Sequence, residues 1–444
     1  MSSTVTVIQG ATVVNEGECR RASLRIEEGR IAEVAYDRSL SASAACRVVE
    51  ADGALLLPGV IDAHVHMREP GLTHKGTMES ETRAAARGGV TTVLDMPNVV
   101  PQTTSLALLD ERYALAAQQC HVNYGFYLGA TSDNTDDIRR LDIRRCPGVK
   151  LFMGSSTGGM LVEREEALRR IFRESPTLIM THCEDTARIN ANAARAKSLY
   201  GDDPDVSQHP VIRDREACWQ SSALAVRLAR EEGARLHVAH LTTAEELDLF
   251  RPDDPQVSAE ACVAHLLFTD ADYAGLGTRI KCNPAVKTSA DRDALRRALT
   301  DGRIRTVATD HAPHLLSEKE GGALRAASGM PMVQFSLPAM LGLADAGVLS
   351  LTRVVELMCH NPARLLRISG RGFIREGFHA DLTLVRRKPW TVTADAIESL
   401  CGWSPLEGRS LDWQVEQTWV NGQLAWDGSH VDTTVRGEAV RHEA

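Results

Sequence analysis

The chain has 444 residues, of which 43% are hydrophobic, so it is long enough for one large domain and a smaller one. Its 50 basic and 59 acidic side chains give a net charge of -9, and no basic run or basic amphipathic helix indicates a nucleic-acid-binding surface. No apolar run approaches the roughly 20 residues of a membrane span. The ten cysteines include no C-x-x-C pair, which predicts reduced thiols in a cytoplasmic protein.

The first and last parts of the chain are predicted to be rich in β-strands. Residues 1–56 contain short alternating segments separated by glycines and charged turns, and residues 366–430 contain similar segments, such as 379–385. We therefore expect the two ends to combine in one small β-sandwich domain. Residues 431–444 are mostly polar and are expected to form a flexible tail.

Residues 57–365, between these ends, repeat a strand–helix pattern. Several apolar, β-branched segments are followed by stretches with helical character, such as 164–172 and 217–232. This alternation predicts an α/β fold with a (β/α)8 barrel of the TIM type. A doubly wound open sheet is the alternative, but no G-x-G-x-x-G follows the first strand. The eight predicted strands end near His66, Met96, Leu128, Phe152, His182, His240, Cys262 and Asp310.

The end of the first barrel strand carries the sequence Asp62-Ala63-His64-Val65-His66. Residues i and i+2 of a strand point to the same face, so both imidazoles are directed at one point, which suits a metal ion. The motif alone is also typical of a strand with two surface histidines. Later strands, however, end in further side chains of the same kind, namely His182, His240 and Asp310.

A strand-end lysine, Lys150, needs a separate explanation. Active sites of such barrels form at the C-terminal ends of the strands, where four histidines, one aspartate and this lysine would converge. Imidazole and carboxylate groups are suitable Zn²⁺ ligands, whereas an ammonium among cations is disfavoured. Either the Lys150 side chain extends outward to solvent, or its neutral amine adds CO₂ to give a carbamate, an anion able to bridge two metal ions.

These residues resemble those of the amidohydrolase superfamily and, within it, the dihydroorotases. The resemblance covers nearly the whole chain, including residues 377–382 in the second β-rich part. The Asp-x-His-x-His element marks only the superfamily. Two further elements, Arg68-Glu69-Pro70-Gly71 and Met96-Pro97-Asn98, narrow the resemblance towards enzymes that hydrolyse cyclic amides.

The resemblance implies a site with two Zn²⁺ per chain and a defined reaction. His64, His66 and Asp310 would bind one ion, His182 and His240 the other, and carbamylated Lys150 would bridge them, although some bacterial dihydroorotases lack this carbamate. The family reaction is the reversible hydrolysis of dihydroorotate to N-carbamoyl-aspartate, a step of pyrimidine synthesis. Asp310 would be catalytic as well as a ligand, because it could carry a proton to the departing ring nitrogen.

The resemblance also implies a set of substrate-binding residues. Arg68, Asn98 and His314 are candidates for holding the ring carboxylate, which an arginine pairs in a bidentate manner. Asn283 matches a family element that contacts the pyrimidine ring. A salt bridge to Glu69 or Glu79 is the alternative for Arg68, and a turn is the alternative for Asn283. No role is assigned to His237, His265 and His311, and residues 317–331 form either a mobile loop at the mouth or a plain connection.

Two other functions remain open from the sequence. An allantoinase or a hydantoinase acting on dihydropyrimidines would share the metal ligands, but its substrate lacks the ring carboxylate, so Arg68 and His314 favour dihydroorotase. A non-catalytic scaffold of aspartate transcarbamoylase would be expected to lack ligands that are all present here. We expect a small-molecule substrate as the main partner. Whether the chain forms a homodimer or associates with aspartate transcarbamoylase does not follow from the sequence.

Overall fold

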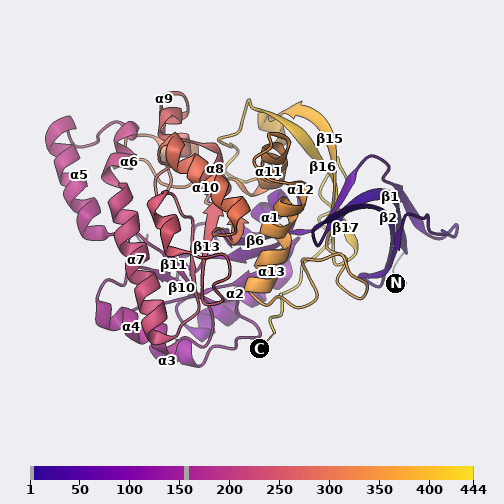
Figure 1. The fold of residues 1–444 in the computed structure, drawn as a ribbon, viewed down its shortest axis with the longest axis horizontal. Helices are drawn as coiled ribbons and strands as arrows, with labels where there is room; N and C mark the ends of the chain where they lie inside the picture. Colours follow the sequence, from indigo (N-terminus) through magenta and orange to yellow (C-terminus); the bar gives the residue numbers. More distant parts are fainter. Residues whose placement is uncertain (1–4, 155–159, 444) are drawn as a thin grey trace.

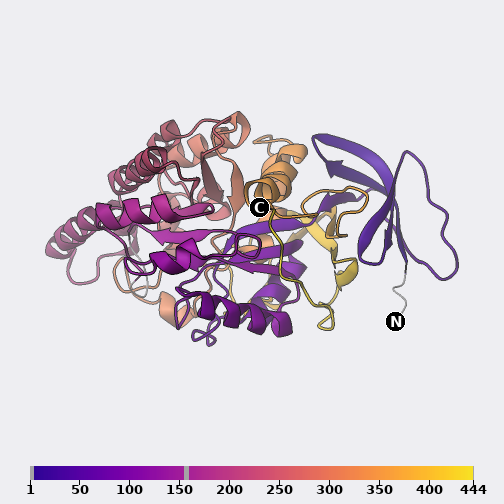
Figure 2. The same ribbon diagram turned by 90° about the horizontal axis from the view of Figure 1, so that it is seen from below.

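The computed structural model describes residues 5–154 and 160–443 and consists of a barrel flanked by a β-rich part. In Figure 1 the N-terminal strands lie at one end of the molecule, and helices α5 (Thr186–Tyr200) and α6 (His209–Ile212) lie at the other. Figure 2 shows the C-terminal strands, in yellow, between the barrel and the indigo N-terminal strands. The two ends of the chain thus meet on one side of the barrel.

Parallel strands form the barrel that the sequence predicts. A three-stranded sheet, β6-β7-β8, is followed in chain order by a six-stranded sheet from β9 to β14. β8 and β9 are separated only by Tyr127 and share one position, so the barrel has the eight positions of a (β/α)8 fold. The strands are β6 (Val60–Val65), β7 (Val90–Asp95), β8 (Asn123–Phe126), β9 (Leu128–Gly129), β10 (Val149–Phe152), β11 (Ile179–His182), β12 (Leu236–Val238), β13 (Val257–Cys262) and β14 (Thr306–Ala308).

The first and last strands close the barrel. Val65 forms a parallel bridge with His311, and the amide of His66 donates to the His311 carbonyl oxygen over 2.7 Å. The buried carboxylate of Asp62 strengthens this junction, because its Oδ2 accepts the hydroxyl of Thr309 over 2.5 Å and its Oδ1 accepts the Thr309 amide over 3.2 Å. These bonds fix the ends of β6 and β14 relative to each other.

Several helices begin at residues whose side chains accept from an amide of the first turn. Thr77 caps α1 by accepting the amide of Ser80, and Asp214 caps α7 by accepting the amide of Ala217 over 2.9 Å. α7 ends at Gly233, whose φ of +72° is a left-handed conformation that glycine adopts without steric cost. The remaining helices are α1 (Met78–Arg87), α2 (Leu106–Gln119), α3 (Thr135–Arg139), α4 (Glu165–Glu174), α7 (Arg215–Glu232), α8 (Val263–Leu267), α9 (Tyr273–Leu276), α10 (Ser289–Asp301), α11 (Ser336–Asp345), α12 (Leu351–Val355) and α13 (Asn361–Leu365).

The β-rich parts of both ends join in one mixed sheet of eight strands. β5 lies between β1, to which it is parallel, and β15, to which it is antiparallel. The sheet has a small apolar core of its own that includes Ile8, Leu24 and Trp419. Its strands are β1 (Thr6–Asn15), β2 (Glu18–Glu27), β3 (Arg30–Tyr36), β4 (Arg47–Glu50), β5 (Leu55–Pro58), β15 (Leu382–Thr391), β16 (Ser410–Val420) and β17 (Gln423–Trp426).

Residues 431–443 do not form the flexible tail that their polarity predicts. Val435 and Val440 are buried, and the Val440 amide donates to the carbonyl oxygen of Tyr124, in β8, over 2.9 Å. In the same region, the amide of Gly437 donates to the carbonyl oxygen of Cys120 over 2.9 Å. Two apolar side chains and a few backbone hydrogen bonds hold this segment against the barrel. The polar composition of the segment as a whole gives no sign of these contacts.

No helix in the described ranges is long and apolar enough to cross a bilayer. All ten cysteines are free thiols, and eight of them are buried. Buried thiols such as Cys183 and Cys262 act as small apolar side chains in the barrel.

Candidate active site

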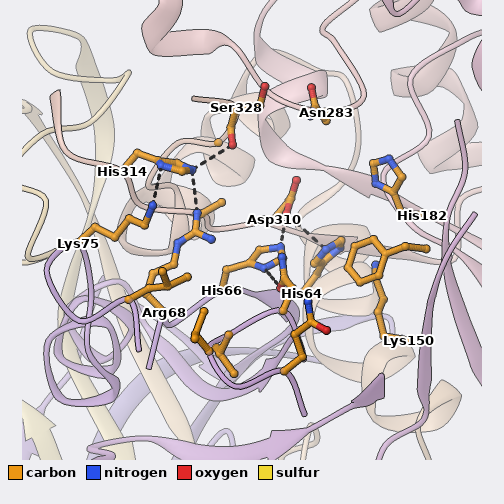
Figure 3. A pocket seen from close by; sticks show the side chains of 18 of the residues that line it. His64, His66, Arg68, Lys75, Lys150, His182, Asn283, Asp310, His314 and Ser328 are labelled. Carbon is orange, nitrogen blue, oxygen red and sulfur yellow. Dashed lines mark hydrogen bonds and ion pairs between the residues drawn. The ribbon is translucent and has the colours of Figure 1, made fainter. Parts of the chain in front are cut away.

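A cavity of about 560 Å³ opens at the C-terminal ends of the barrel strands. This is the end at which (β/α)8 enzymes place their active sites. Figure 3 shows side chains from widely separated parts of the chain pointing into it. All ten site residues predicted from the sequence line this cavity: His64, His66, Arg68, Asn98, Lys150, His182, His240, Asn283, Asp310 and His314.

The two histidines of the first strand face the aspartate that follows the last strand. Asp310 Oδ1 lies 3.3 Å from His64 Nε2 and 3.0 Å from His66 Nε2. Ligand atoms of His64, His240 and Asp310 all lie within 4.8 Å of one another, which is close enough to hold one metal ion. Burial lowers the pKa of His64 and of His240 well below its usual value, which favours the neutral imidazole that binds metals.

A second pair of histidines meets beside this group. His182 Nδ1 lies 3.0 Å from His240 Nε2. The other ring nitrogen of His182, Nε2, lies 2.8 Å from Glu184 Oε2, and the Glu184 carboxylate also pairs with Arg213. Since a carboxylate accepts the proton of Nε2, it leaves Nδ1 of His182 with a lone pair directed into the cavity.

Glu260, on β13, holds the first histidine of the site in a similar way. Its Oε1 lies 2.8 Å from His64 Nδ1, so the opposite nitrogen of His64 faces Asp310. Asn98 does the same for His66, because its Oδ1 lies 2.8 Å from His66 Nδ1. Hydrogen bonds of this kind are typical of metal-binding histidines, whose free nitrogen they fix in orientation and tautomer.

Lys150 is buried at the centre of this arrangement and does not extend to solvent. Only 1% of the residue is exposed, and its Nζ has no hydrogen-bond partner among the described residues. Burial lowers the pKa of the Lys150 ammonium. A buried amine without a partner is costly, so its position indicates that a group absent from the polypeptide completes it.

Three residues of the site have backbone conformations that are unfavourable for side chains other than glycine. The φ angles are +68° for Arg68, +37° for His240 and +50° for Asp310. Each such conformation costs on the order of 1–3 kcal/mol and persists only where the surrounding structure enforces it. All three residues follow a barrel strand by two or three positions and line the cavity.

Arg68 lies on the opposite side of the cavity from Lys150 (Figure 3). Only 6% of the residue is exposed, its Nε donates to the Pro313 carbonyl oxygen over 3.0 Å, and its Nη2 lies 3.1 Å from His314 Nε2. No described carboxylate lies within 4.0 Å of the guanidinium. The alternative salt bridges to Glu69 and Glu79 are therefore not formed, since Glu69 Oε2 accepts the Met78 amide instead.

Asn283 contributes an unpaired acceptor to the same cavity. Its Oδ1 is buried and has no hydrogen-bond partner in the described part of the chain. Figure 3 shows Asp310 between the pair His64 and His66 on one side and Asn283 and Ser328 on the other. The cavity thus joins a group of metal-type ligands to an arginine and an unpaired amide oxygen.

A family model described as the amidohydrolase family matches residues 55–425. The chain belongs to this family. The match spans the whole barrel and most of the second β-rich part, and it confirms the fold and the superfamily resemblance predicted from the sequence. Metal dependence is general in the family, and the ligand group around Asp310 in this amidohydrolase agrees with it.

Curated relatives and solved structures resemble this amidohydrolase over nearly its full length. A Halobacterium salinarum protein named dihydroorotase is 37% identical over 380 residues, covering 85% of this chain and 87% of that protein. A Streptomyces avermitilis protein named allantoinase is 32% identical over 433 residues, covering 95% of this chain and 96% of that protein. The structure of L-hydantoinase (dihydropyrimidinase) from Arthrobacter aurescens has a TM-score of 0.91 at 28% identity, covering 96% of this chain and 97% of that one.

The segment 317–331 is a fixed wall of the cavity in this amidohydrolase. The buried ammonium of Lys319 donates to the carbonyl oxygens of Lys281 over 3.1 Å, Ala327 over 2.6 Å and Gly329 over 2.8 Å. Lys281 Nζ donates in turn to the Ala326 carbonyl oxygen. Two lysines therefore tie the segment that contains Ser328 to the segment that contains Asn283.

The three histidines without an assigned role lie outside the cavity lining and have structural partners. His311 Nε2 lies 2.7 Å from Glu81 Oε2, and His265 Nε2 lies 3.0 Å from the Pro284 carbonyl oxygen. His237 contacts the hydroxyls of Ser258 and Thr306. These contacts give each of the three buried histidines a polar partner in the core.

Sequence reasoning missed three polar residues that support the site: Glu184, Glu260 and Lys75. Glu184 follows His182 by two residues, so strand alternation was a signal that both lie on one face. Glu260 lies on β13, one of the barrel strands from which no ligand was predicted. Lys75 gave no signal, because the turn that brings it to the cavity is irregular.

Proposed function

We propose that this amidohydrolase is a dihydroorotase, which interconverts L-dihydroorotate and N-carbamoyl-L-aspartate in pyrimidine synthesis. The observation that carries the proposal is the buried Arg68 guanidinium, which has no carboxylate partner among the described residues. A buried cation of this kind is costly unless an anion pairs with it. The ring carboxylate of dihydroorotate is such an anion. If Arg68 held this carboxylate, the ring amide would lie beside the candidate metal ligands.

Sequence similarity to the curated relatives does not by itself distinguish dihydroorotate from allantoin as the substrate. Proteins named dihydroorotase and allantoinase both match nearly the whole chain. Allantoin and dihydropyrimidines lack the ring carboxylate, so they would leave Arg68 unpaired. The pocket therefore favours dihydroorotate over both.

The donor set fits two Zn²⁺ ions. His64, His66 and Asp310 would hold one ion, and His182 and His240 the other. Without metal ions, His182 and His240 could simply hydrogen-bond to each other. That arrangement would still leave the buried amine of Lys150 without a partner among the described residues. When bound, the ions would lower the pKa of a water molecule and polarise the ring carbonyl under attack.

Lys150 would supply the bridge between the ions as a carbamate. Its neutral amine attacks CO₂, a nitrogen–carbon bond forms, and one proton leaves, which gives an anionic group with two oxygens. Burial favours this reaction, because it lowers the pKa of Lys150 and so increases the neutral amine. The carbamate would also satisfy a side chain that otherwise lacks a hydrogen-bond partner.

Asp310 would move the proton of the reaction. Its carboxylate would accept a proton from the attacking water and deliver it to the ring nitrogen as the carbon–nitrogen bond breaks. In the direction of ring closure it would remove a proton from the carbamoyl nitrogen. General acid–base assistance of this kind typically contributes about 10²–10⁴-fold.

Arg68 and His314 would hold the ring carboxylate, and the free Oδ1 of Asn283 would accept a ring N–H. Asn98, beyond its predicted contact with substrate, would orient His66. The ten free thiols fit the predicted cytoplasmic compartment.

The proposed function is tested by assaying the purified zinc-loaded protein with dihydroorotate, allantoin and dihydrouracil side by side. We expect the highest kcat/KM with dihydroorotate. A preference for allantoin or dihydrouracil would replace dihydroorotase with the corresponding related function.

A further inference from the structure

Lys75 is a buried lysine at the edge of the cavity for which the reaction above gives no role. It lies in the connection between β6 and α1, lines the cavity and is 8% exposed. Its Nζ donates to Glu318 Oε1 over 2.8 Å and lies 3.3 Å from His314 Nδ1. Figure 3 shows Lys75, His314 and Arg68 on one side of the cavity, with dashed lines joining His314 to both Lys75 and Arg68.

The contacts of His314 define where its proton lies. Ammonium and guanidinium groups only donate hydrogen bonds, so Lys75 faces Nδ1 of His314 as a donor and Arg68 faces Nε2 as a donor, whereas the Ser328 carbonyl oxygen near Nε2 only accepts. Burial, Arg68 and Lys75 all lower the pKa of His314, so the ring is neutral and carries one proton. A proton on Nε2 allows two of these hydrogen bonds, from Lys75 to Nδ1 and from Nε2 to Ser328, whereas a proton on Nδ1 allows only the one from Arg68, so the contacts favour Nε2. Nε2 then donates to the Ser328 carbonyl oxygen, 3.1 Å away.

Glu318 would favour the opposite tautomer if Lys75 were absent. Its Oε2 lies 3.4 Å from His314 Nδ1, without the alignment of a hydrogen bond, and accepts the Leu315 amide over 2.8 Å. An unneutralised carboxylate at this distance attracts a proton to Nδ1. Nε2 would then become an acceptor for Arg68 Nη2, which lies 3.1 Å away.

We propose that Lys75 is a positioning residue that fixes His314 in the tautomer with the proton on Nε2, so that His314 donates to Ser328 and leaves Nη2 of Arg68 to donate to the anionic group of the substrate. In the opposite tautomer, Nε2 of His314 would accept from Arg68 Nη2 and so occupy a donor that the substrate needs. The identity of that anion, the ring carboxylate, rests on the proposed function. The tautomer itself does not.

The test is nitrogen NMR of zinc-loaded protein labelled with ¹⁵N-histidine, in which His314→Gln identifies the His314 signals. We expect the wild type to carry the proton on Nε2 and Lys75→Met to carry it on Nδ1. The double variant Lys75→Met/Glu318→Gln should lose the preference for Nδ1, because the attracting carboxylate is gone. Retention of the Nε2 proton in Lys75→Met would overturn the proposal.

Kinetics on the same proteins show whether the tautomer serves substrate binding. Lys75→Met should raise KM for dihydroorotate about tenfold, the effect of one hydrogen bond to a charged group, with metal content unchanged. Lys287→Met is a matched control, because its buried ammonium donates to the Ala285 carbonyl oxygen over 2.9 Å and does not line this cavity. A tautomer change with unaltered KM would overturn the link to the substrate. Inactivity of the wild type on dihydroorotate would instead refute the proposed function and leave the NMR result valid.

Discussion

His182 Nδ1 and His240 Nε2 lie 3.0 Å apart at the ends of adjacent strands. Glu184 holds the opposite nitrogen of His182, so the lone pair on Nδ1 faces the cavity. The Asp310 carboxylate and the unpartnered Lys150 amine lie in the same cavity. Several groups able to bind metal ions therefore meet around a buried amine that has no partner among the described residues, which is why metal content is the first quantity to predict.

The protein should contain two zinc ions per chain, and Lys150→Ala should lose most of them together with the activity. Without the carbamate no anion would link the two ions. Metal analysis of the purified proteins checks this, with Lys287→Met as the control for loss of a buried lysine elsewhere. A wild-type content near one ion, or full activity of Lys150→Ala, would contradict the bridged site.

Asp310→Asn should give a folded protein with kcat lower by about 10²–10⁴-fold in both reaction directions. The amide oxygen still offers a weak ligand, but it cannot carry a proton. Steady-state rates on dihydroorotate and on N-carbamoyl-aspartate, measured at equal zinc content, check the prediction. A loss under about tenfold would limit Asp310 to metal binding.

Lys319→Met should loosen the wall formed by residues 317–331. Three carbonyl oxygens would lose the ammonium that they share, at a cost of about 1–3 kcal/mol for local opening. Trypsin cleavage after the exposed Arg325 should then become at least about fivefold faster, as followed by mass spectrometry. An unchanged rate relative to Lys287→Met would show that Lys319 does not hold the segment.

The barrel and the candidate ligands at its mouth follow from local sequence patterns. Strand alternation predicts that His64 and His66 share a face, and the barrel geometry brings His182, His240 and Asp310 to the same end. These inferences need only the position of each residue within its own strand, and the structure places all of them in one cavity.

The residues that support the ligands were beyond such patterns. Glu260 contacts His64 across 196 positions of the chain, and Lys75 contacts Glu318 across 243. Whether two such side chains meet depends on loop conformations and rotamers that no short window encodes. The packed segment 431–443 was missed for the same reason, because Val440 finds its partner in β8 and not in its own neighbourhood.

The central claim is that Arg68 recognises the ring carboxylate, and the most direct test compares charged and uncharged substrates. We would measure kcat/KM of the wild type and of Arg68→Met for dihydroorotate and for dihydrouracil. A charge-assisted pair in a closed pocket contributes on the order of 1.5–3 kcal/mol per hydrogen bond, so kcat/KM for dihydroorotate should fall by at least about tenfold. The weak activity on dihydrouracil should change little, because this ring has no carboxylate to lose. An equal fall for both substrates would contradict the account and assign Arg68 to the support of the metal site.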